Sequence, residues 1–177
     1  MSPRSRSLAC ALIAAALLPP LAGCRPEPEE IAVEEEAIQA ALQAYASRLS
    51  QAYAFTDASL LSPIASQREV AAVQRNVESL AAQGQRIATD LKEMSIEEVT
   101  MSDLAHAHVQ TFEVWEIRVM DLGSERVISV DADQRNRVRY QLEREAGEWR
   151  VLWRQRIDDR GGAGAGGGGG AGDAGGA

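Results

Sequence analysis

One segment carries the strongest structural signal in this chain: RYQLEREAGEWRVLW, residues 139–153. Apolar and polar side chains alternate in both halves of it, which is typical of strands that bury one face. Ala146-Gly147 separates the halves and fits a tight turn, so the segment predicts an antiparallel hairpin. In its second strand we expect an inward face and an outward face. The inward residues are Trp149, Val151, Trp153 and Ile157, and the outward residues are Arg150, Leu152, Arg154 and Arg156.

The same alternation predicts the rest of a sheet. The first strand of the hairpin extends from about Arg126 to Glu145, with Val138, Tyr140 and Leu142 on one face. A strand from Ala105 to Met120 precedes it, and a turn at residues 121–124 joins the two. Residues 91–101 are strand-like, although two adjacent glutamates interrupt their pattern.

Helical spacing replaces alternation in the first half of the chain. Apolar residues from Ile38 to Tyr53 recur at steps of three and four, which predicts one face of a long helix. A short helix is expected over residues 57–64. Ser66 and Glu69 have capping-box spacing and open a second long helix, which Gly84 closes. Helices followed by antiparallel strands predict an α+β domain.

The N-terminus has the anatomy of a secretory signal peptide. Arg4 and Arg6 precede an apolar run over residues 8–18, and Leu21-Ala22-Gly23-Cys24 follows. This resembles a bacterial lipobox, in which Cys24 is acylated after cleavage. The apolar run is shorter than the roughly 20 residues that span a bilayer. Because Arg25 follows the cysteine, the resemblance implies an outer-membrane protein that faces the periplasm.

These features divide the chain into four parts. Residues 1–23 are the signal peptide, and residues 24–33 are an acidic Pro/Glu tether. Residues 34–159 form the domain. Residues 160–177 contain almost only Gly and Ala, so we expect a disordered tail.

Composition limits the function classes. Loss of residues 1–23 leaves 16 basic against 26 acidic residues, so the formal charge of −8 becomes −10. Such a chain is a poor candidate for nucleic acid, which requires clustered cations. Cys10 leaves with the signal and Cys24 would be acylated, so no disulfide is expected.

The order of elements over residues 36–158 resembles the nuclear-transport-factor-2-like (NTF2-like) superfamily, and more specifically its IMS domains. Three features carry the resemblance: Gln83-Gly84, the pattern Thr111-x-Glu113-x-Trp115, and the hairpin quoted above. The resemblance implies a strongly curved antiparallel sheet that wraps a long N-terminal helix as a cone, as in NTF2-like and cystatin-like proteins. It supports the fold more than any activity.

A cone of this kind can hold a ligand, and some members of the superfamily are isomerases or cyclases. We expect these residues to line the cavity: Tyr45, Leu49, Tyr53, Trp115, Tyr140, Trp149 and Trp153. Each aromatic ring could instead simply fill the core. Glu113 is the best candidate for a buried carboxylate, free or bonded to an arginine of the final hairpin. An acidic group or a histidine beside Tyr45 or Tyr140 would keep the enzyme alternative open.

Other candidate groups give weaker signals. His106 and His108 lack a visible third metal ligand, and Asp131-x-Asp133 lacks the rest of a calcium loop. We therefore expect no metal and no cofactor. Arginines 135–156 of the last two strands form either a solvated, ion-paired face or a basic patch for an acidic partner or for peptidoglycan carboxylates.

The sequence thus predicts a lipid-anchored envelope protein that binds without catalysis. The bound species is a small apolar molecule in the cone, another envelope protein, or a second copy of the chain in a homodimer. The alternative is an isomerase-like or cyclase-like enzyme that uses the same cavity.

Overall fold

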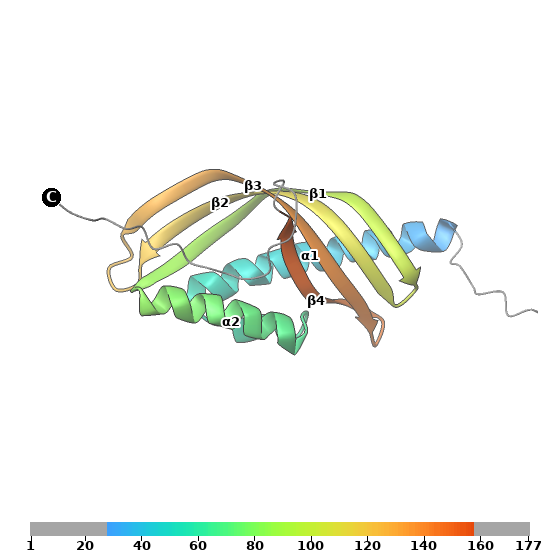
Figure 1. The fold of residues 1–177 in the computed structure, drawn as a ribbon, viewed down its shortest axis with the longest axis horizontal. Coiled ribbons are helices and arrows are strands. Elements are labelled where there is room, and N and C mark those ends of the chain that lie inside the picture. The colour runs from blue at the N-terminus through green and yellow to red at the C-terminus, as the bar shows by residue number, and fades with distance from the viewer. Residues whose placement is uncertain (1–27, 158–177) are drawn as a thin grey trace, which may run out of the picture.

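The computed structural model describes residues 28–157, with side chains from Val33 onward. The predicted signal peptide, Cys24 and the Gly/Ala tail lie outside these residues. The chain forms two helices with a short 3₁₀ turn between them, followed by four strands. Figure 1 colours these elements in chain order. They are α1 (Pro28–Phe55), η1 (Ala58–Leu61), α2 (Gln67–Ala82), β1 (Gln85–Asp103), β2 (His106–Asp121), β3 (Val127–Glu145) and β4 (Glu148–Ile157).

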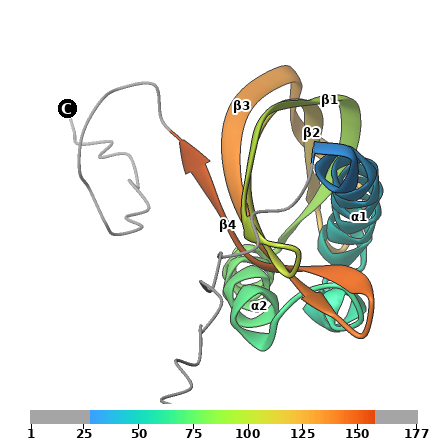
Figure 2. The ribbon, with the colours of Figure 1, turned by 90° about the vertical axis from the view of Figure 1, so that its right-hand side faces the viewer.

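The strands form one antiparallel sheet in the order β1-β2-β3-β4, which confirms the α+β class. Figure 2 shows β1, β2 and β3 arching above both helices, while β4 runs below that arch. The sheet is not closed, because β1 and β4 are edges of it in the described chain. The apolar core lies between α1 and the inner face of the hairpin. Its largest fully buried side chains include Ile38, Leu42, Tyr45, Tyr140 and Leu142.

Helix α1 begins earlier than the sequence predicted. Its first residue is Pro28, inside the segment expected to be an extended tether. Proline suits the first turn of a helix, where its missing N–H would have no partner. Glu34 then lies almost two turns inside the helix and is buried. The structured part of the chain therefore starts before residue 34.

The N-terminus of helix α2 has one of the two hydrogen bonds of a capping box. The Ser66 hydroxyl accepts a hydrogen bond from the Glu69 N–H at 3.2 Å, as the capping-box spacing predicts. The reciprocal bond is absent, because the Ser66 N–H donates to the carbonyl of Val151 on β4 at 2.8 Å. The Glu69 carboxylate is thereby available for other donors. Gly84 ends the helix at φ +69°, as expected of a C-terminal cap.

Bulges explain why the alternation in β1 was weak. Its register with β2 shifts at three points, where Lys92, Glu97 and Ser102 each lack an opposite residue. Each extra residue reverses the inward and outward faces. Met94 and Ile96 pack on the core before the second bulge, and Val99 and Met101 pack on it afterwards. Strict alternation cannot describe such a strand.

A bulge in β4 overturns one prediction. Leu142 is opposite Val151, but Gln141 is opposite Trp153, so Leu152 is the extra residue. Beyond it the faces are reversed. Trp153 points outward and donates to the side chain of Gln141, while Arg154 lies opposite the buried Tyr140 and points inward. The same reversal places Arg156 opposite the buried Val138 and Ile157 opposite the exposed Arg137. The expected faces of Trp153, Arg154, Arg156 and Ile157 are therefore all wrong for this reason.

Candidate functional site

A pocket of about 500 Å³ lies between the helices and the sheet. It forms where β4 no longer covers β3: β4 ends opposite Arg137, and residues 127–136 of β3 have only β2 beside them in the described chain. Both helices and all four strands contribute to the wall. Its apolar residues include Leu49, Val73, Ile87, Trp115, Ile117 and Val138, and its polar residues include Asn76, Thr89, Gln134, Asn136, Glu69, Glu113, Arg154 and Arg156.

Only some of the residues that were predicted to line a cavity lie together at this pocket. Leu49, Tyr53 and Trp115 line the pocket. Tyr45 and Tyr140 are buried, and their rings meet edge to face with centroids 5.9 Å apart. The remaining two tryptophans lie elsewhere: Trp149 bonds Glu34 of α1, and Trp153 is on the outer face.

Glu113 is a fully buried carboxylate with both oxygens engaged. Its Oε1 accepts from the Tyr140 hydroxyl at 2.7 Å and from the Thr111 hydroxyl at 2.9 Å. Its Oε2 accepts from the Trp115 indole at 2.8 Å. The prediction of a buried carboxylate is confirmed. Its donors are these three groups, and none of them is an arginine.

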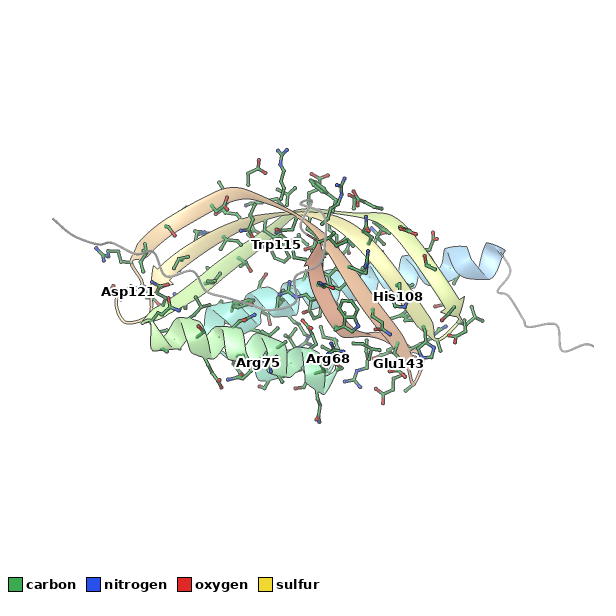
Figure 3. All side chains as sticks on the ribbon, viewed as in Figure 1. Arg68, Arg75, His108, Trp115, Asp121 and Glu143 are labelled. Carbon is green, nitrogen blue, oxygen red and sulfur yellow. The ribbon has the colours of Figure 1, made fainter. Side chains whose placement is uncertain are left out.

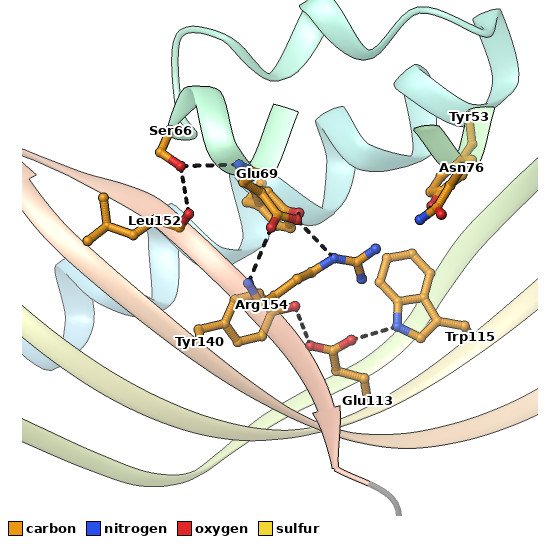
Figure 4. A network of polar contacts seen from close by, with 10 residues as sticks. Tyr53, Ser66, Glu69, Asn76, Glu113, Trp115, Tyr140, Leu152 and Arg154 are labelled. Carbon is orange, nitrogen blue, oxygen red and sulfur yellow. Dashed lines mark hydrogen bonds and ion pairs between the residues drawn. The ribbon is translucent and has the colours of Figure 1, made fainter. Parts of the chain in front are cut away.

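A second carboxylate, Glu69 of α2, holds Arg154 (Figure 4). Glu69 Oε1 accepts from the Tyr45 hydroxyl at 2.6 Å and from Arg154 Nε at 3.3 Å. Its Oε2 accepts from the Arg154 main-chain N–H at 3.3 Å. The Arg154 guanidinium also lies 6.0 Å from the centroid of the Tyr45 ring. In Figure 4 it extends between Glu69 and the Trp115 indole.

Burial controls the ionisation of the phenols. It raises the pKa of Tyr45 well above 10, although the nearby Arg154 acts in the opposite direction. Burial and the negative charge of Glu113 also raise the pKa of Tyr140. Burial alone would lower the pKa of Arg154, but the surrounding tyrosine oxygens and the Glu69 carboxylate raise it on balance. Arg154 is therefore a permanent cation, and both phenols are neutral donors.

The histidines lie apart from this pocket. Figure 3 shows His108 toward the Glu143 end of the sheet, away from Trp115. His106 is half-exposed and contacts Asp103 at 2.9 Å. Within residues 28–157 no three His, Cys, Asp or Glu side chains are grouped as metal ligands.

Most of the arginine-rich outer face is ion-paired. Arg135 pairs with Asp133 at 2.9 Å, Arg137 with Glu97 at 3.1 Å, and Arg150 with Glu145. Such exposed pairs contribute little to stability. Arg154 and Arg156 are the members of this group that the sequence misplaced, because both line the pocket. One signal could have found them: Val151-Leu152-Trp153 are three consecutive apolar residues, which a regular strand with one buried face does not accommodate.

Among curated proteins, none matches this sequence. Among solved structures, the intermembrane space region of the chloroplast protein ARC6 aligns with a TM-score of 0.59 at 16% identity, over 75% of this chain and 98% of that one. A candidate scytalone dehydratase from Novosphingobium aromaticivorans aligns with a TM-score of 0.50 at 12% identity, over 73% of this chain and 87% of that one. These likenesses concern the fold. The family model of the ARC6-like IMS domain matches residues 35–152, so the chain belongs to that family.

Proposed function

We propose that this protein is a non-catalytic binding module of the cell envelope, and that its pocket receives a small ligand. One observation carries the proposal. The pocket combines an apolar wall with polar groups, and both of its carboxylates are engaged by protein donors. Pockets of this size and mixed lining are typical of small-molecule sites. The predicted ligand was apolar, whereas this lining also suits a polar head.

Native mass spectrometry tests ligand binding directly. The chain from Arg25 would be exported behind a cleavable signal, purified gently and weighed. Extra mass of a few hundred daltons on the monomer is the expected result. Ala72→Trp places an indole in the pocket and should remove that mass. Ala71→Trp is the matched control, because Ala71 is exposed on the same helix and is not part of the pocket wall.

A clean mass would contradict pocket binding and favour docking of another envelope protein on the sheet. A clean dimer mass would instead favour association with a second copy of the chain.

An isomerase-like or cyclase-like enzyme is the second candidate. It is favoured by the two Tyr–Glu pairs beside the pocket, Tyr45 with Glu69 and Tyr140 with Glu113. A carboxylate beside each tyrosine is the feature that keeps this alternative open. Incubation of the bound ligand with the protein in D₂O would decide between the two. Deuterium incorporation that Glu113→Gln abolishes would establish catalysis, and an unchanged ligand would support simple binding.

We also propose that the protein is anchored through lipid on Cys24 and faces the periplasm from the outer membrane. The signal-like residues 1–23 support this, as does the envelope compartment named for the related ARC6 region. No helix within residues 28–157 is both long and apolar enough to cross a membrane. Cys24→Ser should yield an uncleaved or soluble precursor. Recovery of that variant as an acylated membrane protein would refute the anchor.

A further inference from the structure

Arg154 has binding capacity that the protein does not use. Its Nε and its main-chain N–H both donate to Glu69, but neither Nη1 nor Nη2 has a hydrogen-bond partner within residues 28–157. The side chain is 26% exposed, and it lines the pocket. The guanidinium therefore presents its two terminal nitrogens to the pocket. Neither terminal nitrogen is a buried atom without a partner within residues 28–157, so water reaches both of them, and an acceptor on a ligand could replace that water.

The two carboxylates of the pocket are already occupied, in contrast to these donors. Glu113 receives three hydrogen bonds, and Glu69 receives three. The amide groups of Asn76, Gln134 and Asn136 add neutral donors and acceptors to the wall. A ligand with acceptor atoms would complement this lining. A ligand amine would find no unoccupied carboxylate and would face a fixed cation.

Charge and shape limit the acceptor to a single negative group. The wall contains two carboxylates and two guanidinium groups, so its formal charge is zero. Against a neutral wall, a dianion would leave two uncompensated charges in a half-enclosed site, whereas a monoanion would leave one and therefore costs less. The planar fork of the guanidinium matches the two oxygens of a carboxylate.

The rest of the wall describes the body of the ligand. Trp115 is nearly buried and lies next to the guanidinium in Figure 4, and Leu49, Val73 and Ile87 also line the pocket. A compact apolar or aromatic group would therefore pack below a carboxylate held by Arg154. Conditional on the pocket-binding function proposed above, we infer that the ligand is a small monocarboxylic acid with an apolar body, bound through Nη1 and Nη2 of Arg154.

Two probes with the same body test the inference by calorimetry. They are naphthalene-2-acetate and its uncharged amide, titrated into the full chain carrying Cys24→Ser, so that no acyl group on the protein competes. The acid should bind at least about tenfold more tightly than the amide, as expected for a charge-assisted bidentate contact. Naphthyl phosphate, a dianion, should bind more weakly than the acid.

Variants separate recognition from folding. Arg154→Gln should reduce acid binding to the level of the amide and leave the amide unchanged, and Arg154→Lys should be intermediate. Glu69→Gln removes the charge that offsets Arg154, so acid binding should strengthen about threefold or more while amide binding stays constant. A residue that acted only on stability would not produce that opposite change. Arg144→Gln, also on the hairpin and also paired to a helix carboxylate, is the control that should change neither affinity.

Each outcome decides a separate point. Equal binding of acid and amide, or tighter binding of the phosphate, overturns the carboxylate inference while leaving a binding pocket. Absence of acid binding in a protein that carries a native ligand also overturns it. Absence of probe binding together with a clean native mass contradicts the pocket function itself. If Arg154→Gln fails to fold, the response to Glu69→Gln remains decisive.

Discussion

Two carboxylates join the helices to the last hairpin, and they do so differently. Glu34 of α1 accepts from Arg144 Nη1 and from the Trp149 indole at 2.9 Å, while Arg144 Nε donates to the Gly147 carbonyl at 3.2 Å. At the other end of the hairpin, Glu69 holds Arg154 only by Nε and the main-chain N–H. In the first pair, Arg144 donates both to Glu34 on the helix and to the main chain of the hairpin turn. The second leaves the terminal nitrogens facing a pocket, so similar pairs serve as a clamp in one place and as a candidate site in the other.

The largest expected effect is a difference in the unfolding free energy that is lost when each carboxylate is removed. Glu69→Ala removes the partner of Arg154 and of the buried Tyr45 hydroxyl, and it should lower the free energy of unfolding by about 3 kcal/mol. Glu34→Ala acts where the Arg144 side chain is 34% exposed and water can replace the carboxylate. Its cost should be about 1.5 kcal/mol. Urea denaturation of both variants measures the difference. Equal losses would show that burial does not distinguish the two pairs.

A smaller effect concerns alkaline pH and belongs to the pocket end alone. Tyr45 bonds Glu69, and burial raises its pKa, whereas the Trp149 indole at the Glu34 end does not titrate in this range. Below about pH 10 the phenol is protonated in both the folded and the unfolded chain, so its contribution to stability is constant. Above that pH only the unfolded phenol ionises. Stability should then fall by up to about 1.4 kcal/mol per pH unit for this group.

Tyr45→Phe removes the phenol that ionises in the unfolded chain. The variant should therefore lose less stability than the parent between pH 9 and pH 11. The burial-raised pKa of Tyr140 predicts a second, independent contribution that Tyr140→Phe removes. Urea midpoints at the two pH values measure both. A Tyr45→Phe variant that loses stability as steeply as the parent would contradict the assignment.

The framework could be predicted because its signals are local. Helical spacing, the Ser66 cap and the Gly84 terminus each depend on neighbours within a turn or two. The Ala146-Gly147 turn likewise sets the hairpin, with φ of +51° and +91°. These features define α1, α2 and the order of the strands without any long-range contact.

The pocket could not be predicted because it depends on register. One extra residue at Leu152 exchanges the faces of β4 and moves Arg154 inward, and no alternation rule reveals where a bulge lies. Glu69 was expected to complete a capping box, but β4 takes the Ser66 N–H that the box would use. The two halves of the site therefore come from contacts between residues that are far apart in the sequence. Contacts between distant residues also decide the positions of Tyr45 and Tyr140. The sequence predicts that both line a cavity, but they are buried against each other in the core.

The smallest expected effect tests whether the Glu34–Arg144 clamp and the Glu69–Arg154 site are independent of each other. Ala146 adopts φ +51°, a conformation that a side chain with Cβ disfavours, and asparagine tolerates it better. Ala146→Asn should raise the free energy of unfolding by about 0.5–1 kcal/mol through the turn. The turn adjoins Arg144 and lies at the opposite end of β4 from Arg154. The gain should therefore appear in urea denaturation while naphthalene-2-acetate affinity stays constant. A change in affinity would mean that the turn and the pocket are coupled along β4, and that the clamp also positions Arg154.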